Sequence, residues 1–168
     1  MVKARGSEMA FRIGVISDTH LHRVTKEFER LYEEYLADKD LIVHAGDIVS
    51  MDVVEFLSRK PLKVVSGNMD PVEVRKRLPS KEVIEIEGFR IGLIHGWGAA
   101  ADLERRVLNE FRNVDVIIYG HSHYPFNEVM EGVLMFNPGT ATGYASAGFH
   151  SLGILDVEDT VKGEIIKL

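Results

Sequence analysis

The sequence predicts an α/β (α+β) fold, a mixed sandwich with β-strands at its centre and helices on its outer faces. Two observations lead to this prediction. In the first half of the chain, short apolar strand patterns alternate with amphipathic helix patterns, which is typical of a parallel sheet with crossover helices. In the second half, alternating apolar runs are separated by turn residues, which indicates antiparallel hairpins. We therefore expect a parallel first half and an antiparallel second half.

The first half follows the order strand, helix, strand, helix, strand. Apolar strands that run into polar loops are predicted at 11–17, 41–46 and 62–67. Residues 25–38 place apolar side chains at i, i+3, i+4, i+7 and i+8, which forms one face of a helix with Thr25 as its N-cap. A second helix is predicted over 51–60 and ends at Pro61, and Pro71 opens a short third helix.

The second half begins with a predicted β-hairpin over 82–96, in which Glu87 and Gly88 form the turn. A helix follows, and its apolar face is formed by Leu103, Val107, Leu108 and Phe111. A buried strand is expected at 115–120. Two further runs of strands, joined by turns that contain Gly and Asp, are expected at 127–139 and 150–168.

We expect a single domain over residues 11–168, preceded by a flexible leader over 1–10, because 168 residues is a usual size for one domain. No repeat or low-complexity tract divides the chain. The leader has no apolar stretch of the kind that a secretory signal requires. The absence of cysteine excludes a disulfide framework, a thiolate zinc site and a cysteine nucleophile, and it fits a cytoplasmic location.

The composition also excludes some partners. The net charge of -6 disfavours strong nucleic-acid binding, because such binding needs many Lys and Arg contacts to phosphates. No apolar run approaches the roughly 20 residues that cross a bilayer, so no membrane partner is expected. The edge strands of a two-sheet sandwich could pair two copies of the chain, so we also consider a homo-oligomer.

Metal-competent side chains follow the ends of five separate strands. They are Asp18, His20, Asp47, Asn68, His95, His121 and His123. In open α/β sheets the ligand crevice lies outside the carboxyl ends of the strands, so these residues are expected to converge. Taken singly, each could be an ordinary cap, turn or strand-edge residue, but together they form a coherent ligand set.

The seven side chains are two carboxylates, one amide and four imidazoles. Mixed nitrogen and oxygen sites suit Mn, Ni, Fe, Co or Zn better than Mg or Ca, which prefer oxygen ligands. Seven ligands are too many for one ion with an open position, but they fit two ions if one carboxylate bridges. Two ions about 3.5–4 Å apart are the usual arrangement for clamping a phosphoryl group.

The same residues lie in five short blocks of sequence. The blocks are Asp18-Thr19-His20, Gly46-Asp47, Gly67-Asn68, His95 and Gly120-His121-Ser122-His123. In order and in strand-end placement they resemble the signature of the calcineurin-like metallophosphoesterases, over nearly the whole chain from Phe11. The small size, Pro125 and the NPGT segment at 137–140 are most similar to the branch of compact prokaryotic phosphodiesterases, to which the small retromer subunit also belongs. The resemblance implies the metallophosphoesterase fold, a four-layer α/β/β/α sandwich of two mixed β-sheets flanked by helices.

The resemblance also implies how the ligands divide between two divalent ions. One ion is expected to take Asp18, His20, Asp47 and His123. The other is expected to take Asp47, Asn68, His95 and His121, with Asp47 as the bridge. A metal-bridging hydroxide would attack phosphorus in a small phosphoester substrate, and Asp47, Asn68 and His95 are the expected catalytic residues.

The chain departs from the family pattern where many relatives have a His–Asp pair that protonates the leaving oxygen. Here the two positions hold Met69 and Ser50, and a thioether cannot donate a proton. His22 is a weak candidate for the missing acid, with a surface role as the alternative. General acid catalysis contributes about 10²–10⁴-fold, so its loss favours diesters with acidic leaving groups.

Three residues close to the blocks have alternative interpretations. His44 is expected to be a hydrogen-bonded core histidine rather than a ligand. Asp70 either caps the following helix or supports the ligand loop around Asn68. Trp97 is expected to anchor its loop, with a contact to substrate as the alternative.

The sequence thus predicts a metal-dependent phosphoesterase, most simply a phosphodiesterase. One alternative is a phosphomonoesterase at the same site, although no basic cluster surrounds the blocks in sequence. Another is a non-catalytic scaffold for protein interactions on the same fold. A single-metal hydrolase of another bond would need a spare carboxylate base, and none is better placed than the ligands themselves.

Overall fold

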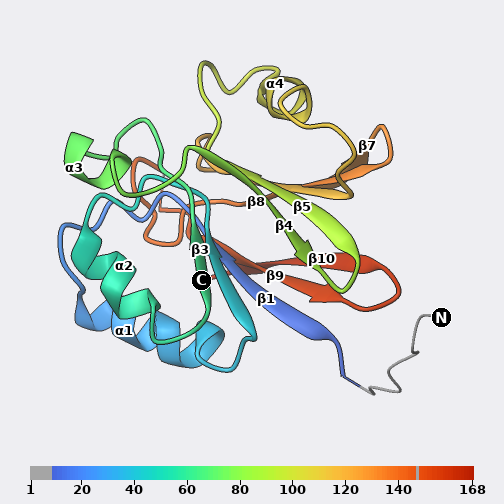
Figure 1. Cartoon of the computed structure of the whole chain (residues 1–168). Coiled ribbons are helices and arrows are strands. Elements are labelled where there is room, and N and C mark those ends of the chain that lie inside the picture. Colours follow the sequence, from blue (N-terminus) through green and yellow to red (C-terminus); the bar gives the residue numbers. More distant parts are fainter. Residues whose placement is uncertain (1–8, 147) are drawn as a thin grey trace.

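The computed structural model describes residues 9–146 and 148–168 (Figure 1). Within these residues, ten strands form two five-stranded sheets that pack against each other, and helices cover the outer faces. The predicted four-layer sandwich of two mixed sheets is confirmed. The predicted leader lies almost wholly outside the described residues, which begin at Met9.

The first sheet has the strand order β10-β9-β1-β2-β3. Its strands are β1 (Phe11–Ile16), β2 (Leu41–His44), β3 (Leu62–Val64), β9 (Ser151–Val157) and β10 (Val161–Lys167). β1, β2 and β3 are parallel, as the strand–helix alternation predicts, and Ile13 lies opposite Leu41. β9 and β10 come from the end of the chain and pair antiparallel on the other side of β1.

The second sheet has the order β4-β5-β6-β8-β7. Its strands are β4 (Lys81–Ile86), β5 (Phe89–Ile94), β6 (Val116–Ile118), β7 (Pro125–Met130) and β8 (Val133–Pro138). The pairs β4–β5 and β7–β8 are antiparallel hairpins, and the first turns at Glu87 and Gly88 as predicted. β5, β6 and β8 are parallel to one another.

The expected parallel first half is confirmed, and the second half contains the expected antiparallel hairpins, but it is not wholly antiparallel, because β5, β6 and β8 are parallel. Helix α4 (Leu103–Leu108) lies on the crossover between β5 and β6, and the β7–β8 hairpin sets β8 parallel to β6. β9 and β10 leave the second half altogether and join β1. The apolar alternation that predicts a strand is local, whereas the partner of each strand is chosen by long-range packing.

The predicted helix over 25–38 is present in two parts. An α-helix, α1 (Lys26–Leu31), continues into a π-helical segment, η1 (Tyr32–Leu36). Thr25 caps the start as predicted, because the backbone N–H of Phe28 donates to its hydroxyl over 3.2 Å. The segment covers the outer face of the first sheet together with α2 (Figure 1), which spans Met51–Leu57.

The next two helices also match their predicted starts. α2 is capped by Ser50, whose hydroxyl accepts from the backbone N–H of Asp52 over 3.1 Å, and it ends at Leu57 rather than at the predicted residue 60. The short α3 (Val72–Arg75) follows Pro71, as expected. Among the described residues, we find no helix whose length and apolarity would carry it across a membrane.

The core lies in three layers, and the alternation of β1 shows how they form. Ile13 and Val15 point between the sheets, where they join Ile118 of the second sheet. The opposite face of β1 packs on α1, η1 and α2, and Gly14 lets Leu36 approach there, because a Cβ atom would lie 2.7 Å from Leu36 Cδ2. A third cluster joins α4 to the second sheet. This packing holds the strand ends in place, so the loops that follow them start from fixed points.

Candidate metal centre

The seven predicted side chains lie in loops that leave the carboxyl ends of five strands, three in the first sheet and two in the second. β1 leads to Asp18 and His20, β2 to Asp47, β3 to Asn68, β5 to His95, and β6 to His121 and His123. The loops also hold each other: the backbone N–H of Asp18 donates to Gly46 O, and that of Gly120 to His95 O, each over 3.0 Å. All seven side chains come together, as the strand-end argument predicts.

The first cluster contains Asp18, His20, Asp47 and His123. One ligand atom from each lies within 4.8 Å of all the others. His123 Nε2 is 3.2 Å from Asp18 Oδ1, and His20 Nε2 is 3.5 Å from Asp47 Oδ2. This is the set that the family resemblance assigns to the first ion.

The second cluster shares Asp47 with the first. His95 Nε2 lies 3.2 Å from Asp47 Oδ2 and 3.1 Å from Asn68 Oδ1. His121 Nδ1 also lies 3.1 Å from Asn68 Oδ1. The four side chains that the resemblance assigns to the second ion are therefore adjacent, with Asp47 between the two groups.

Left-handed backbone conformations aim these side chains. The φ angle is positive at five of the seven residues, namely Asp18 (52°), His20 (47°), Asp47 (56°), His121 (72°) and His123 (65°). Residues with a Cβ adopt this region at a cost of about 1–2 kcal/mol each. Such strain persists only where the surrounding structure enforces it, and it clusters at functional sites.

Two glycines of the sequence blocks are explained by close approach. A Cβ atom at Gly67 would lie 2.2 Å from Asp47 Oδ1, and one at Gly120 would lie 2.0 Å from Ser17 Oγ and 2.6 Å from Asp18 Oδ2. Any side chain at these positions would displace one of the two carboxylates.

His95 and His121 each place one ring nitrogen against a backbone carbonyl and the other ring nitrogen against the amide of Asn68. His95 Nδ1 lies 2.7 Å from Ala45 O, and His121 Nε2 lies 2.7 Å from Gly98 O. A carbonyl oxygen only accepts, so these nitrogens carry the protons of the neutral rings. The other nitrogen of each ring then presents a lone pair to Asn68 Oδ1. Two imidazole lone pairs and an amide oxygen that converge in this way are a donor set that suits a divalent cation.

The first cluster shows the same deficit of protons. Asp18 Oδ1 and His20 Nε2 are buried, and neither makes a hydrogen bond with any described residue, although His123 Nε2 is close to Asp18 Oδ1. Buried polar atoms are almost always paired, so orphaned ligand atoms that face one another indicate a missing partner. The residues present thus fit divalent cations, which accept lone pairs from oxygen and nitrogen.

Electrostatics support the same conclusion. Burial opposes a charge on His95, but its contact with Asp47 and the negative charge of Asp18 prevail and raise its pKa to about 9. Contact with Asp18 likewise raises the pKa of His123. Burial opposes ionisation of Asp18 and Asp47, yet contacts with His123 and His95, respectively, lower the pKa of both carboxyls. Protons on imidazoles therefore offset the carboxylates here, and a metal ion could replace them.

Asp70 supports the bridging residue rather than the following helix. Its buried carboxylate accepts from the backbone N–H groups of Asp47 (3.1 Å), Val49 (2.6 Å) and Gly67 (2.7 Å). The N-cap of α3 is Pro71, with no side-chain cap, so the helix-cap interpretation of Asp70 is wrong and the supporting role is confirmed. Asp70 ties two ligand loops together.

His44 is a core histidine, as predicted. It is fully buried, its Nδ1 accepts from the backbone N–H of Gly46 over 3.2 Å, and its Nε2 lies 2.9 Å from Thr19 Oγ1. Burial lowers its pKa to about 3, so it stays neutral. It braces the first two ligand loops from inside the sheet.

Three contributors were not identified from the sequence. Ser17 donates to Asp18 Oδ2 over 2.6 Å. The amide of Asn137, in the NPGT segment, donates to Gly120 O and Ser122 Oγ and so fixes the loop of the last two histidines. The ring of Tyr144 stacks on His20 with centroids 3.7 Å apart. Only Asn137 had a signal in the sequence, since it lies in a segment that the family resemblance already includes.

The structure provides no general acid at Met69 and Ser50, the two positions where the chain differs from the family pattern. The side chain of Met69 is exposed, while its backbone N–H donates to Asp47 Oδ1 over 2.8 Å. Ser50 Oγ is engaged as the cap of α2. His22 is exposed and makes no hydrogen bond or ion pair with the residues that the structure describes.

Trp97 differs from its expected role. The residue is 43% exposed rather than buried, and the loop is held instead by Arg106, which donates to the backbone carbonyl of Trp97. The ring lines a pocket beside Asn68 and His95. The alternative interpretation, a contact at the rim of the site, therefore agrees better with the structure.

Comparison with known proteins gives a consistent result. The sequence model of the Calcineurin-like phosphoesterase superfamily domain matches residues 11–160. A probable metallophosphoesterase of Methanocaldococcus jannaschii is 36% identical over 160 residues, which cover 93% of this chain and 81% of the relative. A protein of the same organism that is named a phosphodiesterase is 29% identical over 170 residues, with coverages of 92% and 98%.

Solved structures agree on the fold. A structure described as a novel archaeal phosphodiesterase superposes with a TM-score of 0.70 at 25% identity, and the match covers 94% of this chain and 99% of that chain. Vps29 of Entamoeba histolytica, solved in complex with zinc, gives a TM-score of 0.68 at 25% identity, with coverages of 93% and 98%.

Proposed function

Because the chain belongs to the calcineurin-like phosphoesterase superfamily, we propose that it is a metal-dependent phosphodiesterase with two divalent cations. One observation carries this proposal: the Asp47 carboxylate lies between two groups of oxygen and nitrogen ligand atoms. Two of these buried ligand atoms, Asp18 Oδ1 and His20 Nε2, have no hydrogen-bond partner among the described residues. A single buried carboxylate in this position suits a bridge between two ions.

The first ion would be held by Asp18, His20, Asp47 and His123, and the second by Asp47, Asn68, His95 and His121. The mixed nitrogen and oxygen donors favour Mn, Ni, Fe, Co or Zn over Mg. When bound, such a pair of ions supplies an activated water and offsets the charge that develops on a phosphoryl group. The chain's own task is to fix the donors before substrate arrives.

Asp47, Asn68 and His95 are the proposed catalytic residues. Two hydrogen bonds fix Asp47: its Oδ1 accepts from the backbone N–H of Met69, and its backbone N–H donates to the carboxylate of Asp70. His95 is oriented by Ala45 O. Because these side chains are already in position, little reorganisation is needed when charge develops on the substrate.

The lack of a proton donor supports a diester with an acidic leaving group. A leaving oxygen of low basicity departs without an added proton, whereas an alkoxide needs one. The Met69 thioether has no proton to give, and the Ser50 hydroxyl, which accepts from Asp52 N–H in the cap of α2, is not among the usual general acids. There are two alternatives. One is a phosphomonoesterase at the same site, and the other is a scaffold for protein interactions on the fold that the chain shares with Vps29.

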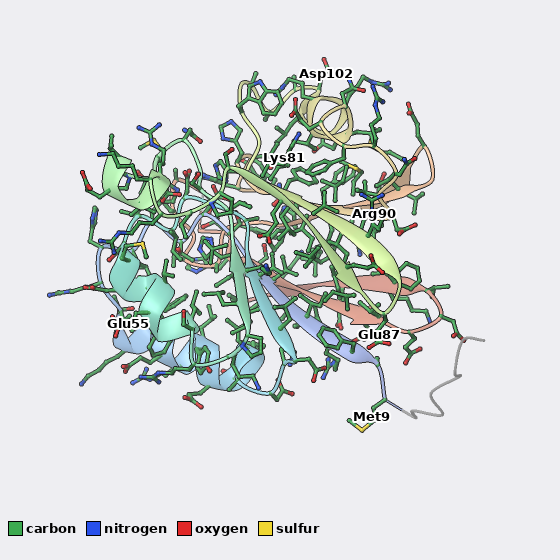
Figure 2. The ribbon with its side chains drawn as sticks, viewed as in Figure 1. Met9, Glu55, Lys81, Glu87, Arg90 and Asp102 are labelled. Atoms are coloured by element: carbon green, nitrogen blue, oxygen red, sulfur yellow. The ribbon has the colours of Figure 1, made fainter. Side chains whose placement is uncertain are left out.

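A metal and activity assay separates these three functions. Metal content per chain would be measured first, and then turnover of bis(p-nitrophenyl) phosphate and p-nitrophenyl phosphate with Mn²⁺, Ni²⁺ or Mg²⁺. We expect faster turnover of the diester, and Asp47→Asn should abolish it. Glu55→Gln is a matched control, because Glu55 is an exposed acid on α2 (Figure 2).

Each alternative has its own outcome in this assay. Preference for the monoester would favour the phosphomonoesterase. Bound metal without turnover of either ester would favour the scaffold. An Asp47→Asn variant as active as the wild type would contradict the proposed site.

A further inference from the structure

A pocket opens next to the second ligand group. Its cavity volume is about 530 Å³, which lies within the range of about 300–1,000 Å³ usual for small-molecule sites. Asn68 and His95 form one wall of it, so the pocket is continuous with the candidate metal centre. Arg75, Trp97, Lys81 and Glu110 also contribute to the lining.

The pocket combines an aromatic face with a free positive charge. Trp97, a lining residue that is 43% exposed, contributes an indole ring that can stack with a planar group. Arg75 is exposed at the end of α3, and its guanidinium makes no hydrogen bond or ion pair with any residue that the structure describes. A guanidinium of this kind is suited to a bidentate contact with a phosphate or carboxylate.

The second cation of the pocket is already neutralised. Lys81, labelled at the start of β4 in Figure 2, lies with its Nζ 3.2 Å from Glu110 Oε2 and 2.9 Å from Glu110 O. Of the two cations, Arg75 is therefore the one whose charge is not already paired within the described residues and can pair with a ligand. Without the structure these two cations could not be placed near the ligands, because both follow Asn68 by several residues and no basic cluster marks the sequence blocks.

We propose that this pocket binds one arm of the phosphodiester substrate, and that this arm carries a planar ring and a second anionic group, as a nucleotide does. Trp97 would stack on the ring, and Arg75 would pair with the second anion. The proposal rests on the proposed function, since it identifies the substrate class of the same site. It assigns both residues a role in positioning the substrate and none in the chemical step.

The single tryptophan of the chain makes a direct binding test available. Intrinsic fluorescence of chelator-treated protein would be titrated with adenosine 5′-monophosphate, which has ring and anion. Adenosine lacks the anion, and ribose 5-phosphate lacks the ring. We expect saturable quenching by the nucleotide, with an affinity at least about ten-fold above that for either fragment. This readout requires no turnover, so its failure and the failure of the proposed function are distinguishable.

Variants locate the two contacts. Arg75→Gln should weaken nucleotide binding about five-fold and leave adenosine binding unchanged. Arg77→Gln should change neither, because Arg77 is exposed on the same segment and does not line the pocket. Measured by calorimetry, Trp97→Leu should lose about ten-fold in affinity for the nucleotide, and Trp97→Phe should restore most of it.

The proposal fails if the wild type shows no saturable quenching, or if ribose 5-phosphate binds as tightly as the nucleotide. It also fails if Arg75→Gln behaves like Arg77→Gln. Turnover of bis(p-nitrophenyl) phosphate by the same preparation would show in either case whether the diesterase activity itself is present.

Discussion

His95 Nε2 lies 3.2 Å from Asp47 Oδ2, while the other nitrogen of the same ring is held by Ala45 O at 2.7 Å. The imidazole therefore faces the carboxylate either with an added proton or with a bare lone pair. With the proton, the pair is a buried ion contact; without it, both atoms are free to bind the same cation. This alternative between proton and metal leads to the first prediction.

The stability of the metal-free protein should fall as pH rises from about 6.5 to 9. The pKa of His95 is raised from 6.5 to about 9 in the folded chain, so its contribution is fully present below pH 6.5 and is lost as pH rises through 9. The full loss is on the order of 3 kcal/mol in the free energy of unfolding. Urea unfolding of chelator-treated protein at pH 6.5 and 9 would measure it.

Saturating Mn²⁺ supplies the control for this prediction. A metal takes the lone pair of neutral His95, so stability should then rise with pH over the same range. A metal-free protein whose stability is constant or increases from pH 6.5 to 9 would contradict the assigned contact.

Replacing Asp70 should weaken metal binding without touching a ligand. In Asp70→Asn, one of the carboxylate oxygens that accept from Asp47, Val49 and Gly67 is replaced by an amide donor. Metal affinity is expected to fall about 10–100-fold, the usual effect of losing a group that orients a ligand. Titration of Mn²⁺ by calorimetry tests this, with the exposed Glu73→Gln as control. Equal affinities of the two variants would rule out the supporting role.

A methyl group at Gly67 should displace the bridging carboxylate. The added Cβ would lie 2.2 Å from Asp47 Oδ1 and 2.6 Å from Asp47 N, and backbone atoms cannot move aside cheaply. Gly67→Ala should therefore lose metal binding and about 1–3 kcal/mol of stability. Gly88→Asn should be tolerated, since nothing lies within 4 Å of that turn and Asn accepts a positive φ. Normal metal content in Gly67→Ala would count against the geometry.

Rates should depend steeply on the leaving group. With no proton donor at Met69 or Ser50, kcat/KM should fall continuously along a series of aryl diesters of rising phenol pKa, and alkyl diesters should be slower by about 10²–10⁴-fold or more. His22→Asn should leave the series unchanged, because His22 is exposed and has no contact that ties it to the site among the described residues. A flat series would mean that an acid has been overlooked, and a steeper series in His22→Asn would identify it.

The strand ends were predictable because apolar strands and the polar residues after them are local patterns. All seven candidate ligands follow such ends, and the topology brings them together in two adjacent groups that share Asp47. The supporting residues were harder to predict, because their roles depend on which loops become neighbours. Nothing in the order Asn68-Met69-Asp70 states that the last carboxylate turns back to the loop of Asp47.

Sheet pairing was predicted less well for the same reason. The strand patterns of β9 and β10 are evident in the sequence, but their place beside β1 is set by burial of the inter-sheet core, where Leu155 packs with Ile13. Tyr144 lies in a loop without periodic pattern, so its stacking on His20 could not be predicted from sequence spacing.

The measurement that tests the central claim most directly is the number of metal ions bound per chain, determined by elemental analysis after loading with Mn²⁺ or Zn²⁺. Two ions are expected in the wild type and one each in His123→Asn and His121→Asn, because these residues belong to different ligand groups. Asp47→Asn, which alters both groups, should retain less than either. A single ion in the wild type, or the full wild-type content in Asp47→Asn, would contradict a dinuclear centre bridged by Asp47.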